Sequence, residues 1–287
     1  MKSKVKYQRV LFVVVAVVLA MFWGCSKQPV ETPKADTSAN AKPTLSNADK
    51  AYEMLEVQNT YSKHAYYHAY PQLYCQELED IWVKQDGPNA ATASWTNAQG
   101  IQVGMELIKK NYCTENMKNV QKSLDAISKI YPEIQNVPEN LGAGTGYTIH
   151  TQTTPIIEVA GDGKTAKGLW YSPGIATNTM IKNGKAETGG NWFFEKYGID
   201  FVKEDGEWKI WHVGMYYDPT PPTWGSQMEM IKAAQPVEAA EKAPSAGGLA
   251  MTKPNPKPYE TWSPKSVLKL EPQFPEPYYT FSETFSY

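Results

Sequence analysis

Two histidines stand one helical turn apart in the segment HAYYHAYPQLY, which holds His64 and His68 among four tyrosines. The whole chain contains only 4 histidines, so this pair is the first place to look for chemistry. A spacing of i and i+4 puts both imidazoles on one helix face, which suits a metal chelate. The pair also fits half of an acid–base site, or polar groups satisfied by tyrosine hydroxyls inside a packed helix. Because neither a glutamate-rich motif nor a paired-cysteine motif accompanies it, the sequence predicts no metal.

Aromatic residues make up 12% of the chain, with 9 Trp and 18 Tyr. This composition is typical of an apolar cavity lining with polar handles, and equally of an aromatic core. In EWKIWHVGMYYD, His212 alternates with Trp208 and Ile210, so the strand pleat could aim it into a pocket or leave it near the surface. The side chains that we expect to line a pocket are Trp95, Trp170, Trp192, Trp208 and His212. The formal net charge of −2 gives no reason to expect nucleic acid as a partner.

The elements that must position these residues follow from periodicity and from turn signals. A helix capped by Ser46 or Asn47 is expected to end at Pro71, and a short helix follows it. A short strand is predicted at residues 93–96, and a long helix after Gly104. From residue 142 the pattern predicts four strands, joined by turns at Gly161-Asp162-Gly163, Asn183-Gly184 and Asp205-Gly206. This order predicts an α+β fold, in which a strongly curved antiparallel sheet wraps around N-terminal helices.

The first 25 residues have the composition of an export signal: basic residues precede an apolar run from 10 to 23. The Gly24-Cys25 pair that follows resembles the lipobox of bacterial lipoproteins, although Phe22 and Trp23 depart from that pattern. We expect Cys25 to carry the lipid that anchors the chain in the cell envelope, outside the cytoplasmic membrane. An uncleaved membrane anchor is the alternative.

The remaining cysteines, Cys75 and Cys113, are predicted either to form a disulfide or to be two buried thiols. Residues 26–45 have the composition of a flexible tether, and residues 226–258 that of a linker. The folded domain is expected over 46–225. Residues 259–287 mix prolines with aromatic side chains, so this tail is predicted to dock on the body or on a second subunit. A loosely ordered extension is the alternative.

Three segments together resemble a known family. KGLWYSPGI, EKYGIDFVKEDGEWKIWHVGMYYD and the front half HAYYHAY…ELEDIWVK…VGMELIKKNY look like the SnoaL-like branch of the nuclear transport factor 2-like superfamily. The resemblance implies a cone-shaped fold around one deep, mostly apolar pocket. Members that act as dehydratases, dehydrochlorinases, isomerases or cyclases bind a compact hydrophobic molecule there, and many need no metal or cofactor. Family members are often dimers or trimers, so the resemblance permits a homo-oligomer.

Carried over to this chain, the family's histidine base matches His150 in TIHTQTTPIIEV. The aspartate that orients this base in the family falls between His68 and Pro71, where this chain has no carboxylate. His68, or a phenol from Tyr67 or Tyr70, is therefore expected to orient His150, and a neutral partner stabilises an imidazolium less than a carboxylate does. Tyr67 or Tyr70 could also act as general acid or oxyanion donor.

Three functions remain open from the sequence. The first is a membrane-tethered lyase or isomerase, independent of cofactors, that uses His150 as base on a hydrophobic small molecule. The second is a non-catalytic ligand-binding lipoprotein of the same fold. The third is a structural envelope protein whose aromatic tail binds a partner.

Overall fold

The computed structural model describes residue 42 and residues 44–218, 253–255 and 270–287. The predictions for the export signal, for Cys25, for most of the tether and for nearly all of the linker lie outside these residues. Contacts divide the chain into residues 1–42 and 43–287, and every element described below belongs to the second unit. In the described part of the chain, no helix combines the length and the hydropathy that a membrane span requires.

The first helix, α2, spans Asn47–His68, and it begins where the capping signal predicts. The Ser46 side chain accepts a hydrogen bond from the Asp49 amide at 3.1 Å, which satisfies one of the free N–H groups of the first turn. The helix ends shortly before Pro71, which opens a short 3-10 turn, Pro71–Leu73. The buried side chains of α2 recur at helical spacing along one face and are Val57, Thr60, Tyr61 and His64.

The helix predicted after Gly104 is divided in three. Its middle part has the wider π-helical turn, and Tyr112 and Cys113 lie in that part. The helical elements after α2 and the Pro71 turn are α3 (Tyr74–Ile81), α4 (Met105–Ile108), the π-helix (Lys109–Glu115), α5 (Asn116–Ile130) and the 3-10 turns Pro138–Asn140 and Phe281–Glu283.

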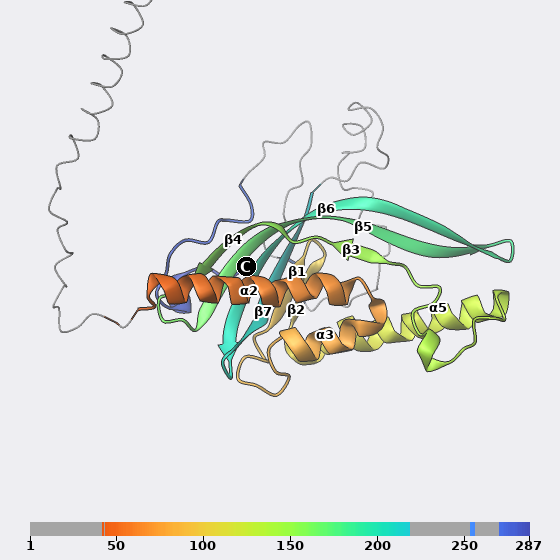
Figure 1. The fold of residues 1–287 in the computed structure, drawn as a ribbon, viewed down its shortest axis with the longest axis horizontal. Helices are drawn as coiled ribbons and strands as arrows, with labels where there is room; N and C mark the ends of the chain where they lie inside the picture. Colours follow the sequence, from red (N-terminus) through yellow and green to blue (C-terminus); the bar gives the residue numbers. More distant parts are fainter. Residues whose placement is uncertain (1–41, 43, 219–252, 256–269) are drawn as a thin grey trace, which may run out of the picture. The chain divides into compact units, whose positions relative to one another are not determined.

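Within the described residues, the strands form one seven-stranded sheet in the order β2-β1-β7-β6-β5-β3, with β4 also paired to β5. Its strands are β1 (Ser94–Asn97), β2 (Gly100–Val103), β3 (Thr148–His150), β4 (Thr153–Val159), β5 (Thr165–Lys182), β6 (Lys185–Glu204) and β7 (Glu207–Asp218). The predicted α+β fold is confirmed, with helices on one face of a curved sheet (Figure 1). Two details differ from the prediction: β1 pairs with β7 in parallel, and the first predicted strand is divided into β3 and β4.

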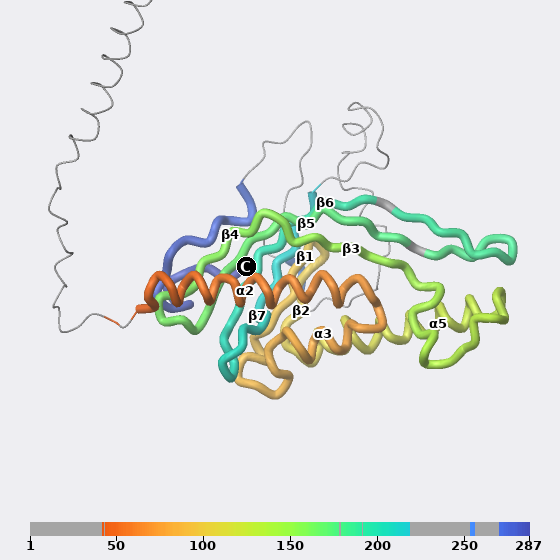
Figure 2. The backbone as a smooth tube through the Cα atoms, viewed as in Figure 1, coloured from red at the N-terminus to blue at the C-terminus, as the bar shows by residue number. Residues whose placement is uncertain are grey.

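The two sheet faces are distinguished along β6. Tyr197 and Ile199 belong to the core shared with α2, while the alternate residues Gly198 and Asp200 face the opposite side. Figure 2 shows α2 running along the face on which the helices lie, which we call the inner face. The register shifts between Asp200 and Phe201, where His212 and Ile210 of β7 are the successive partners. Trp211 is therefore the extra residue of a β-bulge, which reverses the alternation of β7.

The outer face is covered by the C-terminal residues. The Gly161 amide donates to the Tyr278 carbonyl at 2.9 Å, and the Tyr287 amide donates to the Asp200 carboxylate at 3.1 Å. Gly198 leaves space for the Tyr287 ring, since a Cβ there would lie 2.2 Å from a ring carbon. Residues 278–287 thus contact the sheet, while residues 259–269 of the predicted docking tail lie outside the described part of the chain.

Candidate functional site

The two histidines of HAYYHAYPQLY belong to one buried hydrogen-bond network. His64 Nδ1 lies 2.7 Å from Glu77 Oε1, and the hydroxyl of Tyr112 donates to Glu77 Oε2 at 2.6 Å. His68 Nδ1 is hydrogen-bonded to the same Tyr112 hydroxyl. Glu77 is fully buried, so the hydrogen bonds on both of its oxygens are what make its burial tolerable.

The direction of these hydrogen bonds fixes the tautomers. An ionised carboxylate only accepts, so His64 carries its proton on Nδ1 and donates it to Glu77. Since the Tyr112 hydroxyl already donates to Glu77, its oxygen accepts from Nδ1–H of His68. Both imidazoles therefore present Nε2 as the nitrogen with a free lone pair.

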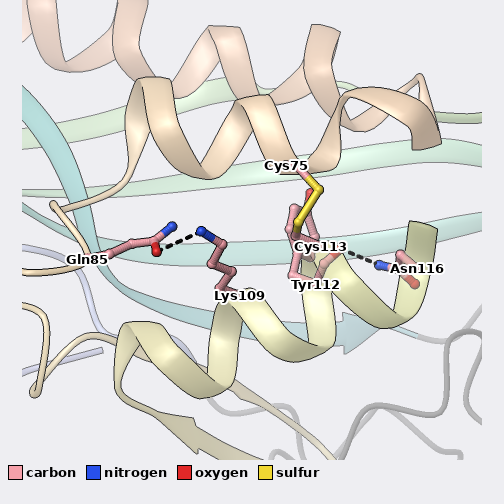
Figure 3. The surroundings of a disulfide bond; sticks show 6 residues. All are labelled: Cys75, Gln85, Lys109, Tyr112, Cys113 and Asn116. Carbon is pink, nitrogen blue, oxygen red and sulfur yellow. Dashed lines mark hydrogen bonds between the residues drawn. A yellow bond between two sulfur atoms is a disulfide. The ribbon is translucent and has the colours of Figure 1, made fainter. Parts of the chain in front are cut away.

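A disulfide joins the two elements that carry Glu77 and Tyr112. Cys75 of α3 is bonded to Cys113 of the π-helix, which settles the alternative that the sequence left open. Figure 3 shows this bond, with Tyr112 and Cys113 adjacent on the π-helical turn. Cys75 precedes Glu77 by two residues, so the covalent link holds α3 beside the turn that presents the Tyr112 phenol.

His150 has a network of its own on the sheet. Its Nδ1 lies 3.4 Å from the Tyr197 hydroxyl and 3.4 Å from Glu195 Oε2, and that hydroxyl donates to Glu195 Oε2 at 2.8 Å. By the same reasoning, Nδ1 of His150 carries the proton and Nε2 has the lone pair. His150 is in register with Gly174 of β5, where a side chain would collide with the Phe193 ring. Glu195 of β6 thus supplies His150 with the carboxylate partner that the segment between His68 and Pro71 does not contain.

The two networks meet at their histidines. The ring centroids of His68 and His150 are 4.4 Å apart, and those of His64 and His150 are 6.1 Å apart. Burial, together with the neighbouring imidazoles, lowers the pKa of His68 well below its usual range. Burial raises the pKa of Tyr112 and of Tyr197 well above the usual value, so both phenols stay protonated at neutral pH.

Aromatic rings surround the meeting point. Tyr74 stacks on His68 with a centroid distance of 4.9 Å, and Phe193 lies 4.7 Å from the His150 ring. His68, Tyr74 and Phe193 are partly exposed, whereas His64, Glu77 and Tyr197 are buried. The partly exposed edge of the network is therefore aromatic, and we call Tyr74 and Phe193 its aromatic rim.

Tyr67 and Tyr70 do not take the roles expected of them. The Tyr67 hydroxyl is hydrogen-bonded to Asp80, and the Tyr70 ring is 46% exposed and packs against Tyr147. The Tyr67 phenol is thus held by a carboxylate of α3, and Tyr70 lies beyond the end of α2.

The tryptophans expected to line a pocket divide into two groups. Trp95, Trp170 and Trp208 are buried in the core, whereas Trp192 is 41% exposed. The Tyr61 ring packs 4.5 Å from Trp170, so aromatic rings occupy the interior at that point. Two hollows of about 450 and 400 Å³ are seen in the described part of the chain, and both are lined from Gln85 and the segment around α4 and the π-helix. Neither contains a histidine, so the predicted pocket around His150 is not observed there.

The expectation that His212 faces a pocket with Trp208 is wrong because of the β-bulge. Trp208 Nε1 donates to Glu53 of α2 at 2.7 Å, on the inner face. His212 lies on the outer face instead, with Nδ1 2.9 Å from Asp200 Oδ2 and 3.0 Å from the Ser286 hydroxyl. Because Asp200 and Ser286 meet the same ring nitrogen, these three residues do not have the geometry of a nucleophile–base–acid triad.

The site also contains residues that the sequence did not single out. They are Glu77, Tyr112, Glu195 and Tyr197. Glu77 lies among apolar residues of the α3 helix, so it could have been noticed as a charge predicted to be on a buried face. Glu195 and Tyr197 lie on the same face of β6 as Phe193, but no motif near them in the sequence indicates that they contact His150. Within the described residues, His64, His68 and Glu77 also form a group whose potential metal-ligand atoms all lie within 4.8 Å of one another.

No curated protein matches the chain. Solved structures similar to it include a hexachlorocyclohexane dehydrochlorinase from Novosphingobium barchaimii, with 15% identity, 63% of this chain and 97% of that chain covered, and a TM-score of 0.39. Another is a proposed dehydratase of the NTF2-like family from Streptomyces avermitilis, with 14% identity, coverage of 57% and 96%, and a TM-score of 0.39. A third is an NTF2-like superfamily protein from Salmonella enterica, with 15% identity, coverage of 62% and 96%, and a TM-score of 0.34.

At these identities and TM-scores, the reactions of the neighbours do not transfer to this chain. The family assignment comes from the sequence itself, since the family model of the SnoaL-like domain matches residues 51–214. That match spans more than half of the chain and includes the π-helix, β3 and most of α2 and of β7. The chain therefore belongs to the SnoaL-like family.

Proposed function

We propose that this protein is a lyase or isomerase acting on a hydrophobic small molecule, with Nε2 of His150 as the general base. The observation that carries this proposal is the orientation of His150, whose Nδ1 faces the Tyr197 hydroxyl and the Glu195 carboxylate. A base needs a free lone pair on one nitrogen and a partner that stabilises the imidazolium on the other. Glu195, on β6, takes the place of the carboxylate that α2 lacks.

The proposed step is a proton transfer that needs no cofactor. Nε2 of His150 takes a proton from a carbon atom of the substrate, and the C–H electron pair stays on the substrate. In an elimination, that pair forms the new double bond as the leaving group departs with its own bonding pair. In an isomerisation, the imidazolium returns the proton to a different carbon. Glu195 stabilises the imidazolium in both cases, and Tyr197 holds the ring in position.

The aromatic rim supports a flat, apolar substrate. Tyr74 stacks on His68 and Phe193 packs against His150, so the neighbours of both imidazoles are ring faces rather than charges. The substrate must also present an acidic C–H to Nε2 of His150. Cyclic ketones with acidic α-protons meet both requirements, and they are the probes that we select.

The test is deuterium exchange into a panel of cyclic ketones in D₂O, followed by mass spectrometry. Exchange reports proton abstraction even when no elimination follows. We expect His150→Gln to lower the exchange rate by about 10²–10⁴-fold, the usual contribution of a general base, and Glu195→Gln to lower it less. The matched control is His212→Gln, which removes a buried histidine next to a carboxylate on the opposite sheet face and is expected to leave exchange unchanged.

The alternative function, ligand binding without chemistry, is favoured by the length of the two His150 contacts, 3.4 Å each. If the wild-type protein is stabilised against heat by a panel member but never exchanges its protons, the alternative replaces the proposal. Equal exchange by the wild type and by His150→Gln also contradicts the proposed role of His150.

The membrane location is part of the same proposal, supported by the Gly24-Cys25 pair after the apolar run. The Cys25 thiol would carry the lipid that holds the domain in the cell envelope. Growth of a bacterial host on a radiolabelled fatty acid should label the full chain but not Cys25→Ser. Equal labelling of both would contradict lipid attachment at Cys25.

A further inference from the structure

The geometry points to a polar subsite beside the proposed base, in which Gln152 and Ser172 of the sheet and Tyr61 of α2 bind an oxygen atom of the substrate. This inference rests on the proposed function, since it names the group that stands next to the substrate's acidic C–H. His150 takes the proton, and the subsite holds the carbonyl oxygen. The substrate class is thereby narrowed to rings whose acidic carbon is bonded to a carbonyl group.

The strand register places Gln152 and Ser172 side by side. The pairing of His150 with Gly174 and the first pairing of β4 with β5 have the same register, so Gln152, which lies between them, stands opposite Ser172. Ser172 is in turn the ladder partner of Glu195 on β6. Ladder partners share a sheet face, with Cβ atoms about 5 Å apart. These three residues therefore form one row across the inner face, next to His150.

The polar atoms of this subsite are buried and without partners. Nε2 of Gln152, Oγ of Ser172 and the Tyr61 hydroxyl have no hydrogen-bond partner among the described residues. Ser172 has no exposed surface and Tyr61 is only 1% exposed, so solvent does not compensate them. A buried polar atom without a partner is costly, and such exceptions call for an explanation. All three groups can donate, so one accepting oxygen atom of a ligand suits them.

Tyr61 brings its donor from α2, across the interior from the sheet. Its ring packs 4.5 Å from that of Trp170, which is the neighbour of Ser172 on the inner face of β5. Burial raises the pKa of Tyr61 well above its usual range, and the nearby Gln152 amide acts in the opposite direction. The phenol and this amide are therefore close to each other, although neither atom is hydrogen-bonded. A substrate oxygen that accepts from both would satisfy both.

The proposed reaction needs donors at this place. When Nε2 of His150 takes the proton, the C–H electron pair forms a C=C bond and the carbonyl π pair moves onto the oxygen atom. Neutral donors beside that oxygen stabilise the charged enolate more than the ketone, which lowers the barrier. Glu195 is also near, but the imidazolium that forms in the same step offsets its negative charge. The row thus provides a base and its carboxylate for the proton, and neutral donors for the oxygen.

The experiment uses the full chain and cyclohexanone labelled with ¹³C at its carbonyl carbon. We expect the infrared carbonyl band of the bound ketone to lie below its position in an apolar solvent, because hydrogen-bond donors weaken the C=O bond. Gln152→Leu and Ser172→Ala should each move the band back toward the apolar position and lower the rate of deuterium exchange by about 100-fold. Their effect on ketone binding should stay within about 10-fold, since the donors act mainly on the charged enolate.

The matched control is Gln102→Leu, which makes the same change at another buried amide without a partner, on β2, and should leave the band and the exchange rate unchanged. His150→Gln separates the two proposals, because it should lose exchange and keep the shifted band. If Gln152→Leu does not fold, Ser172→Ala decides the matter, since it removes one oxygen atom only.

Three outcomes would overturn the inference: no binding of the ketone by the wild type, a bound ketone whose band is not shifted, or exchange at the wild-type rate in the folded Gln152→Leu and Ser172→Ala proteins. A shifted band that depends on Gln152 and Ser172, in a wild-type protein that never exchanges protons, would support the subsite and contradict the proposed reaction.

Discussion

The outer face of the sheet holds a buried ion pair whose disruption should strongly destabilise the fold. Lys167 of β5 and Asp200 of β6 are directly opposite in the ladder, with Nζ 2.6 Å from Oδ1, and neither side chain is exposed. Three rings of the C-terminal residues lie over the ammonium group, at 4.7 Å for Phe281, 4.5 Å for Phe285 and 5.1 Å for Tyr287. Burial lowers the pKa of Lys167 despite its carboxylate partner, so this cation is costly to leave unpaired.

The perturbation is Asp200→Asn, which keeps the shape and removes the charge. The remaining cation keeps the amide oxygen of the new residue and the aromatic rings as neighbours but has no counter-charge, and removing one partner of a buried pair costs about 3–5 kcal/mol. That is a large share of a total stability of about 5–15 kcal/mol. Lys167→Met should cost a similar amount, because it leaves the carboxylate buried without its cation.

The double variant is the sharper test. Lys167→Met with Asp200→Asn contains no unpaired charge, so it should be more stable than either single variant, with a coupling energy of at least about 2 kcal/mol. Urea unfolding, followed by tryptophan fluorescence, gives the midpoint for the wild type and for each variant. The m-value should be the same for all of them, so that the midpoints report stability directly. The control is Asp205→Asn, which makes the same chemical change in an exposed pair with Lys84 and should not move the midpoint.

Two outcomes would refute the reasoning. If the costs of the single variants add in the double variant, the two charges do not compensate each other. If Asp200→Asn shifts the midpoint no more than Asp205→Asn does, the buried pair is not the source of stability. A single variant that fails to accumulate in soluble form, while the double variant does, would still support coupling.

Three further outcomes follow from contacts elsewhere. Cys75→Ser with Cys113→Ser should lower the free energy of unfolding by about 4 kcal/mol, since the disulfide closes a separation of 38 residues; an unchanged urea midpoint would contradict this. Gly198→Ala should displace the Tyr287 ring, because its new Cβ would lie 2.2 Å from a ring carbon. We expect carboxypeptidase to remove the C-terminal residues of this variant faster than those of the wild type. Digestion at the wild-type rate would count against the contact. Burial raises the pKa of Tyr216 to about 12 and that of Tyr287 further, so the folded state keeps these protons while the unfolded chain loses them near pH 10. Stability should therefore be intact below pH 10 and fall as the pH rises from 10 toward 12, with unfolding and tyrosinate absorbance appearing together; tyrosinate that forms without unfolding would show that the phenols are solvated.

The local parts of the fold were predictable because their signals act over a few residues. Ser46 caps α2 as its type predicts, since its hydroxyl needs only the amide three residues ahead. The Asn183-Gly184 turn was predictable as well, because both residues adopt the positive φ that a two-residue hairpin requires. The fold class then followed from the order of these elements and from the family resemblance.

The π-helix and the β-bulge were not predictable, and both moved functional residues. Periodicity predicts one continuous helix after Gly104, whereas the wider turn at Lys109–Glu115 sets the position of Tyr112 beside Glu77 and His68. The bulge at Trp211 puts His212 on the outer face, although alternation predicts that it shares a face with Trp208. A bulge cannot be recognised from the alternation of side chains along a strand, because the extra residue interrupts that alternation without any residue type of its own.

The absence of an aspartate near the end of α2 suggested a weaker base, but the position of a carboxylate along the chain matters less than its position in space. Glu195 lies on β6, two residues beyond Phe193, and Phe193 pairs with the β5 residue that stands in register with His150. Successive residues on the same face of a strand are about 7 Å apart, so a glutamate side chain can reach back across that distance. Glu77 meets His64 from α3 in the same way, after the turn at Pro71. Each carboxylate thus reaches its histidine from a neighbouring element, which a search of α2 alone could not reveal.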